Sequence, residues 1–262
     1  MKNKKFDVVY SIGFGCGMAR LMQLSRLRMT SGPFDWVTGP NFEYRIDLIL
    51  NNFAGFFDKE DLSFVEKSEN DYQPEDPNRH TDTYKNLKNG FIHPHDFMEG
   101  DDFDKTYPKV LEKYNRRIER FYEYLKDTNK RVLLAYLSFS SLDDRSVYEC
   151  YKKLVEKFGN HISLLIFNHK PTFDYNTIEK RYLDENIVVY DLNNVLYTEN
   201  NKLVVRGNKA LIMPLLKHYK LNLSFIETVV ATFTRLSVKY CGLFIWNKKK
   251  RFEYREKYKN RV

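Results

Sequence analysis

Short apolar runs that alternate with helical stripes constrain the fold of this chain more than any other feature of its sequence. β-branched and aromatic residues form strand-like runs at residues 8–12, 132–137, 162–167 and 187–190. Apolar side chains recur at helical spacing at residues 18–27, 41–52, 107–126, 147–158 and 177–183. This alternation predicts βαβ units, and therefore a three-layer α/β fold whose mainly parallel sheet has helices on both faces.

Polar and reactive residues follow each of the predicted strands. In parallel sheets, ligands bind in the loops beyond the carboxyl ends of the strands. Those loops carry Cys16, the serines Ser138 and Ser140, His169 and Asp191. We therefore expect the functional site at this edge of the sheet.

The chain has the length and composition of one sizeable domain. Of its 262 residues, 42% are hydrophobic and 16% aromatic, which is enough for a substantial core. No linker rich in proline, glycine or serine divides it, and no internal repeat is present. We expect a single α/β catalytic domain at residues 1–222, followed by an amphipathic helix and a basic tail at residues 223–262.

The net charge of +8 comes mainly from the carboxyl end. Residues 248–262 carry eight basic and two acidic side chains, which leaves 35 basic and 33 acidic side chains in the rest of the chain. A near-neutral body with a basic tail argues against a nucleic-acid-binding domain.

The cysteine pattern bears on the compartment. Cys16, Cys150 and Cys241 are far apart, and they form neither a disulfide framework nor the paired spacing of a zinc site. The first residues are too short in apolar length for a signal peptide. These features predict a cytoplasmic protein.

Cys16 lies where the first strand gives way to a helix. Gly13, Gly15 and Gly17 break the strand, and the helical spacing begins at Met18. Unpaired amides and the positive end of the helix dipole favour the thiolate, which is the nucleophilic form. The glycines would also let a substrate carbonyl approach backbone N–H donors closely, as an oxyanion hole requires.

Two other interpretations of this turn stay open. Cys16 can be a small buried core residue, which is a common place for a free cysteine. Gly13, Gly15 and Gly17 can hold a cofactor diphosphate, although the turn has neither a P-loop ending nor a full GxGxxG. Either would suit a noncatalytic protein that binds a glycan or a nucleotide.

A pair of histidines follows a long polar segment. Residues 66–89 are polar, as in a lid or binding loop, and His93 and His95 then flank a proline. Together with Asp96 they could join a metal site, although further ligands are missing. One of them could instead be the base that takes the Cys16 proton, or both could only cap an irregular loop.

Several motifs together resemble a bacterial and viral family of papain-like cysteine peptidases. They occur in the first half of the chain in the order SIGFGC at residues 11–16, SGPFDW at 31–36, HDF at 95–97 and Arg116-Arg117-Ile118. The resemblance implies a Cys/His site with Cys16 as nucleophile and His95 as base. Asp35 and Asp96 are the first candidates for the carboxylate that orients the imidazole, and Asp191 is a third.

The chain also resembles, more distantly, cysteine-dependent capsule-polysaccharide acetyltransferases. Because a βα turn delivers Cys16, we expect acyl transfer, with a transferase acting on a surface glycan or related small substrate ahead of a peptidase or hydrolase. No cofactor is required, although a coenzyme A thioester could be the acyl donor, and no metal is expected.

The segment at residues 223–246 is apolar enough to raise the question of a membrane span. Glu227, Arg235 and Lys239 argue against one, because charges at bilayer depth are costly. An apolar stripe that includes Ile226 and Phe233 would face the domain core or a membrane surface. In the second case, the basic tail would make peripheral contact with anionic lipid at the inner face of the membrane.

Overall fold

The computed structural model describes residues 4–68, 80–199, 203–204, 206–224 and 228–229. Its main sheet has the strand order β2-β6-β7-β9-β8. The strands are β2 (Val8–Ser11), β6 (Val132–Leu137), β7 (Ile162–His169), β8 (Ile178–Asp184) and β9 (Ile187–Leu192). Neighbouring strands are parallel except at β8, which pairs antiparallel with β9. The predicted mainly parallel sheet is confirmed.

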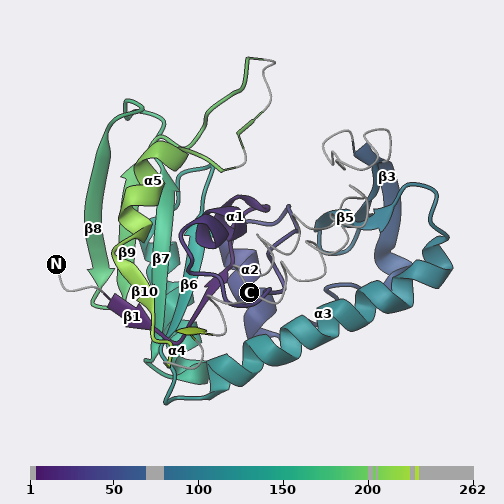
Figure 1. Ribbon diagram of the computed structural model, residues 1–262, viewed down its shortest axis with the longest axis horizontal. Coiled ribbons are helices and arrows are strands. Elements are labelled where there is room, and N and C mark those ends of the chain that lie inside the picture. Colours follow the sequence, from purple (N-terminus) through teal and green to yellow (C-terminus); the bar gives the residue numbers. More distant parts are fainter. Residues whose placement is uncertain (1–3, 69–79, 200–202, 205, 225–227, 230–262) are drawn as a thin grey trace.

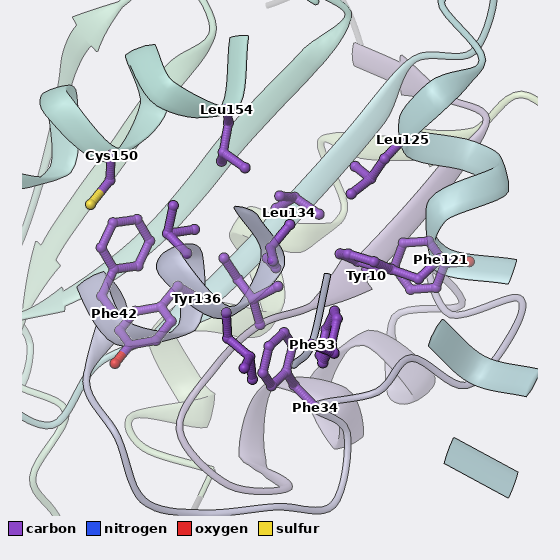
Figure 2. Packing of buried hydrophobic residues seen from close by; sticks show 14 of the residues in the cluster. Tyr10, Phe34, Phe42, Phe53, Phe121, Leu125, Leu134, Tyr136, Cys150 and Leu154 are labelled. Carbon is purple, nitrogen blue, oxygen red and sulfur yellow. The ribbon is translucent and has the colours of Figure 1, made fainter. Parts of the chain in front are cut away.

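Helices cover both faces of this sheet. One face carries α2 (Phe42–Leu50), α3 (Phe103–Lys126) and α4 (Asp144–Phe158), whereas α1 (Gly17–Leu24) and α5 (Lys209–Leu216) cover the other. Successive side chains of β6 point to opposite faces: Leu134 and Tyr136 enter the first core, and Leu133 and Ala135 enter the second. Figure 2 shows the first core, in which aromatic rings from α2 and α3 meet the sheet. The three-layer α/β prediction is therefore confirmed.

Polar side chains at the helix starts explain why the helices begin where they do. Asn41, Asp102, Asp143 and Asn208 each accept a backbone N–H from the first turn of α2, α3, α4 and α5, respectively. Such a cap contributes about 1 kcal/mol because it pairs an amide that has no partner within the helix.

A small antiparallel sheet is inserted between β2 and β6. It consists of β3 (Leu62–Ser68), β4 (Thr81–Asn86) and β5 (Ile92–Met98), preceded by a short 3-10 helix, η1 (Lys59–Asp61). Figure 1 shows this sheet on the side of the molecule away from β8, with α3 running between the two parts. The prediction of a polar loop at residues 66–89 is thus wrong at both ends. Residues 66–68 belong to β3, and residues 81–86 form β4, in which Thr81, Thr83 and Asn86 are buried. Residues 69–79 lie outside the described part.

The predicted helix at residues 177–183 is also wrong, because this segment forms strand β8. Glu185 and Asn186 connect it to β9 in a tight hairpin, and the Asn186 amide donates to Asp184 Oδ1 at 3.0 Å. At the edge of the sheet, pairing with β9 outweighs the local helix preference.

The first and last of the described strands form a separate two-stranded sheet. Strand β1 (Lys4–Phe6) pairs in parallel with β10 (Tyr219–Leu221). Most of the predicted C-terminal amphipathic helix and all of the basic tail fall on residues 230–262, outside the described residues. Within the part of the chain that the structure describes, no helix combines the length and hydropathy that crossing a bilayer requires.

One buried cation stands out in the first core. Arg45 is fully buried, and its guanidinium lies over the rings of Phe34 and Phe91, 5.2 and 4.9 Å from their centroids. Its Nε donates to the Pro40 carbonyl at 2.9 Å, whereas Nη1 and Nη2 have no hydrogen-bond partner among the described residues. Burial lowers the pKa of Arg45 to about 10, with Tyr136 opposing the shift. Keeping this charge in the interior therefore costs free energy.

We expect Arg45→Met to raise the free energy of unfolding by about 1–2 kcal/mol, because the methionine fills the space without a desolvated charge. Contacts with the two aromatic rings offset part of the cost of the native charge, so the gain is modest. Urea unfolding of the variant checks this. Arg45→Lys, which keeps the charge but not the planar stacking, is the matched control and should lower stability. A loss of stability in Arg45→Met would mean that the aromatic contacts outweigh the burial cost.

Candidate active site

Cys16 is at the N-cap position of α1, directly after the turn that follows β2. The first intrahelical hydrogen bond runs from the Arg20 amide to the Cys16 carbonyl at 2.9 Å. The amides of residues 17–19 therefore precede the hydrogen-bonded ladder of the helix, where backbone donors and the helix dipole favour an anion. The Cys16 side chain is partly exposed. The cysteine thus lies where the sequence predicts it, in the strand-to-helix turn that follows the carboxyl end of β2.

Two of the glycines around Cys16 have structural reasons of their own. A Cβ on Gly13 would lie 2.9 Å from Met18 Cβ and 3.1 Å from the Leu137 amide nitrogen, so only glycine lets the turn pack against β6. Gly15 has φ +68°, a left-handed conformation that other residues rarely adopt. Gly17 is the buried first residue of α1. The predicted role of these glycines in binding a cofactor stays a prediction.

The indole of Trp36 connects α1 with the histidine segment. Its ring meets the His95 ring edge to face, with centroids 5.9 Å apart. The guanidinium of Arg20 lies 4.8 Å from the indole centroid, and that of Arg28 lies 5.6 Å from it. Arg20 is four residues after Cys16 on the same helix face, so Trp36 contacts both the helix that follows Cys16 and the strand that carries His95.

Backbone hydrogen bonds also connect the cysteine turn with the segment that carries the histidines. The Gly15 amide donates to the Val37 carbonyl at 3.2 Å, which ties the cysteine turn to the segment that carries Trp36. Thr38 and Ile92 then exchange both backbone hydrogen bonds, at 3.0 and 2.9 Å. The cysteine turn is thus joined to the start of β5 through one intervening segment.

A bulge in β5 separates the environments of the two histidines. Tyr84 pairs with His93 and Asp82 with Phe97, so three residues of β5, 94–96, face the single residue Thr83. Bulges re-aim side chains and are frequent beside active sites. His93 is fully buried, whereas His95 is partly exposed against Trp36. This difference favours His95 over His93 as the group that can meet a substrate.

Asp96 belongs to a buried network below the bulge. Its Oδ2 accepts from the Tyr114 hydroxyl at 2.5 Å and lies 3.3 Å from His93 Nδ1, and its Oδ1 accepts from the Lys113 ammonium. Burial alone would raise the pKa of Asp96, but Lys113 and His93 outweigh it and hold the pKa well below its usual range. Burial and the Asp96 carboxylate raise the pKa of Tyr114 well above 10. These contacts hold His93 and Asp96, which precede and follow His95 in β5.

Asp35 is held in an ion pair that water does not reach. Arg28 donates to Asp35 Oδ2 through Nε at 3.0 Å and Nη2 at 2.7 Å, and the Gly32 amide adds a third donor at 3.0 Å. The two side chains are 2% and 1% exposed. Arg28 Nη2 also donates to the Ser31 hydroxyl at 2.7 Å. Asp35 therefore fixes the loop that carries Trp36, and its role toward His95 stays a prediction.

The third candidate carboxylate belongs to another cluster. Asp191 accepts from Asn168 Nδ2 at 2.6 Å and from the Arg181 guanidinium, beside the hairpin of β8 and β9. Burial opposes the shift, but these donors hold the pKa of Asp191 below its usual range. A structural role at the far edge of the sheet accounts for these contacts.

The alternative of a metal site at the histidine pair gains no support. Among the described residues, no group of three or more His, Cys, Asp or Glu side chains is arranged to hold a metal ion. The network of His93 with Asp96 and Tyr114 accounts for the buried histidine instead.

The sequence-based assignment of roles missed Arg20 and Trp36. Trp36 belongs to the SGPFDW motif, but nothing in its spacing indicates that its ring contacts both α1 and β5. Arg20 lies one helical turn after Cys16, and that spacing is the signal that could have identified it.

Comparison with known proteins adds a family and a viral relative. A family profile described as "Putative papain-like cysteine peptidase (DUF1796)" matches residues 7–178, more than half of the chain. The uncharacterized protein R408 of Acanthamoeba polyphaga mimivirus is 29% identical over 194 residues, which cover 68% of this chain and 86% of that protein. No solved structure matches the chain. The matched range includes Cys16, Trp36 and His95.

Proposed function

This chain belongs to the family described as "Putative papain-like cysteine peptidase (DUF1796)", and on that basis we propose that it is a cysteine hydrolase with Cys16 as nucleophile and His95 as general base. The observation that carries the proposal is the position of Trp36, whose ring contacts both His95 and Arg20, one turn after Cys16. The position of Cys16 at a helix start and a bulge that presents His95 support the same assignment.

The proposed reaction has two steps. The Cys16 sulfur attacks the carbonyl carbon of an amide or ester, and His95, protonated by the thiol, gives that proton to the leaving amine or alcohol. A water molecule then attacks the resulting thioester while His95 takes its proton, and the carbon–sulfur bond breaks to release the acid. The free amides at the start of α1 can stabilise the oxyanion of each tetrahedral intermediate.

In this proposal, Asp35 and Asp96 are positioning residues. Asp35 holds the loop of Trp36 through Arg28, and Asp96 holds the bulge of β5 through Lys113 and Tyr114. Neither needs to contact the substrate. Their contribution would be to keep the imidazole of His95 within reach of the sulfur, since small displacements of a catalytic group are costly.

Water is the acceptor that the family description favours. Transfer to a sugar hydroxyl, a coenzyme A thioester as donor, and a surface glycan as substrate stay predictions. Turnover of p-nitrophenyl acetate in the presence of a sugar distinguishes hydrolysis from transfer to a sugar hydroxyl. Free acetate is the expected product, whereas an acetylated sugar would favour a transferase.

Selective alkylation tests the nucleophile. A short iodoacetamide pulse at pH 7.5 should label Cys16 at least tenfold faster than Cys150, because burial, with Glu43 and Asp47 adding to it, raises the pKa of Cys150 to about 11. Mass spectrometry of the peptides measures the labelling of Cys16 and Cys150, and the labelling of Cys241 is quantified separately. His95→Ala should slow labelling of Cys16, whereas His161→Ala, just before the amino end of β7, should not. Equal labelling of Cys16 and Cys150 in folded protein would overturn the assignment.

A further inference from the structure

Arg20 carries a positive charge on α1, one helical turn after the candidate nucleophile. It lies four residues after Cys16, on the same face of α1, and its side chain is partly exposed. Its Nη1 donates to Gln23 Oε1 at 3.4 Å, and its guanidinium lies over Trp36. Within the described ranges it forms no ion pair with a carboxylate. Stacking on the indole thus holds the guanidinium in place and leaves donors for another partner.

Among the described residues, the two candidate carboxylates Asp35 and Asp96 are already matched by other cations. Asp35 pairs with Arg28, and Asp96 pairs with Lys113. The charges within each pair cancel, so Arg20 and the amides at the start of α1 are left as a source of positive potential near Cys16. An acyl substrate that carries a negative group near the scissile bond would complement this potential.

We propose that Arg20 determines specificity by binding a carboxylate or phosphate group of the substrate next to the bond that Cys16 attacks. The inference rests on the proposed function, since it assigns the substrate of the same site. A guanidinium suits such a group because its planar fork donates two parallel hydrogen bonds to two oxygens. Arg20 would contact the substrate but take no part in proton transfer.

Alkylation by reagents that differ only in charge measures this potential. Iodoacetate is negatively charged and iodoacetamide neutral, so the ratio of their rate constants at Cys16 reports the local field. We expect Arg20→Gln to lower this ratio by about fivefold, and the ratio divides out any change in the reactivity of the sulfur that both reagents report. Arg20→Lys should restore most of the ratio. Arg26→Gln, which removes the same charge from an exposed side chain beyond the end of α1, is the matched control and should leave the ratio unchanged.

Protection by free anions identifies the bound group. At constant ionic strength, inorganic phosphate or succinate should slow iodoacetamide labelling of Cys16 in the native protein but not in Arg20→Gln. Stronger protection by phosphate assigns a phosphate-bearing substrate, and stronger protection by succinate assigns a carboxylate. An equal ratio of rate constants in native protein and Arg20→Gln would overturn the proposal for Arg20. Poor labelling of Cys16 relative to Cys150 would instead refute the nucleophile, so the two failures are distinguishable.

Discussion

Replacing Asp35 with alanine should lower the free energy of unfolding by about 3–5 kcal/mol. The Arg28 guanidinium would then lie in the interior without a counterion, because both side chains of the pair are at most 2% exposed. The Gly32 amide would also lose its acceptor. Urea unfolding followed by tryptophan fluorescence measures the change, and the signal is informative because Trp36 is next to Asp35 in the chain.

A double substitution separates the effect of losing the ion pair from the effect of leaving Arg28 without a counterion. Asp35→Leu combined with Arg28→Met removes both charges, so it should be less destabilising than Asp35→Ala alone. Asp47→Ala is the surface control, since Asp47 and Lys153 form an exposed pair, and it should change stability by less than about 1 kcal/mol. If the double variant is as unstable as the single one, the lost hydrogen bonds, from the Gly32 amide to Asp35 and from Arg28 to the Ser31 hydroxyl, account for more of the lost stability than the unpaired charge does.

Asp96→Ala should lower stability by a similar amount, about 3–4 kcal/mol at pH 7, because Lys113, Tyr114 and His93 all lose their common acceptor. Its pH dependence is distinctive. The pKa of Asp96 is held below the value in the unfolded chain, so the ionised carboxylate stabilises the fold above about pH 4. That contribution is lost as the pH falls toward the folded-state pKa.

The difference in stability between native protein and Asp96→Ala should therefore be constant from pH 8 to 5 and shrink below about pH 4. Urea titrations at several pH values measure it. Asp104→Ala, which removes an exposed carboxylate from the start of the same helix α3, should show a small difference throughout. A difference that grows as the pH falls from 8 to 6 would show that protonation of a histidine, and not the charge of Asp96 alone, governs the network.

The main sheet could be predicted because its strands and helices each carry a strong local pattern. The apolar runs of β6, β7 and β9 are buried on both faces, and the capped starts of α3 and α4 agree with the tertiary fold. Strand β8 was missed because its residues alternate only weakly between buried and exposed, and its pairing with β9 decides its conformation. Strand β4 was missed for another reason: the side chains on its buried face, Thr81, Thr83 and Asn86, are polar.

The candidate site was predictable at Cys16, where glycines and helical spacing mark the strand-to-helix turn. The partners of Asp35 and Asp96 were not, because they depend on which cation the fold brings to each carboxylate. Arg28 is seven residues from Asp35 through a loop, and Lys113 reaches Asp96 from α3. Spacing along the chain carries no information about either pairing.

The insertion between β2 and β6 sets the order in which the site can be assembled. Strand β2 is at the edge of the main sheet, and its neighbour β6 pairs Val8 with Val132. During synthesis, the small sheet and α3 therefore emerge before the turn of Cys16 has a strand to pack against. Contacts between residues so distant in sequence form slowly, since a long loop must close before they stabilise the chain. The turn that carries Cys16, the proposed nucleophile, is thus completed only after the segment that carries His95, its proposed partner, has been synthesised.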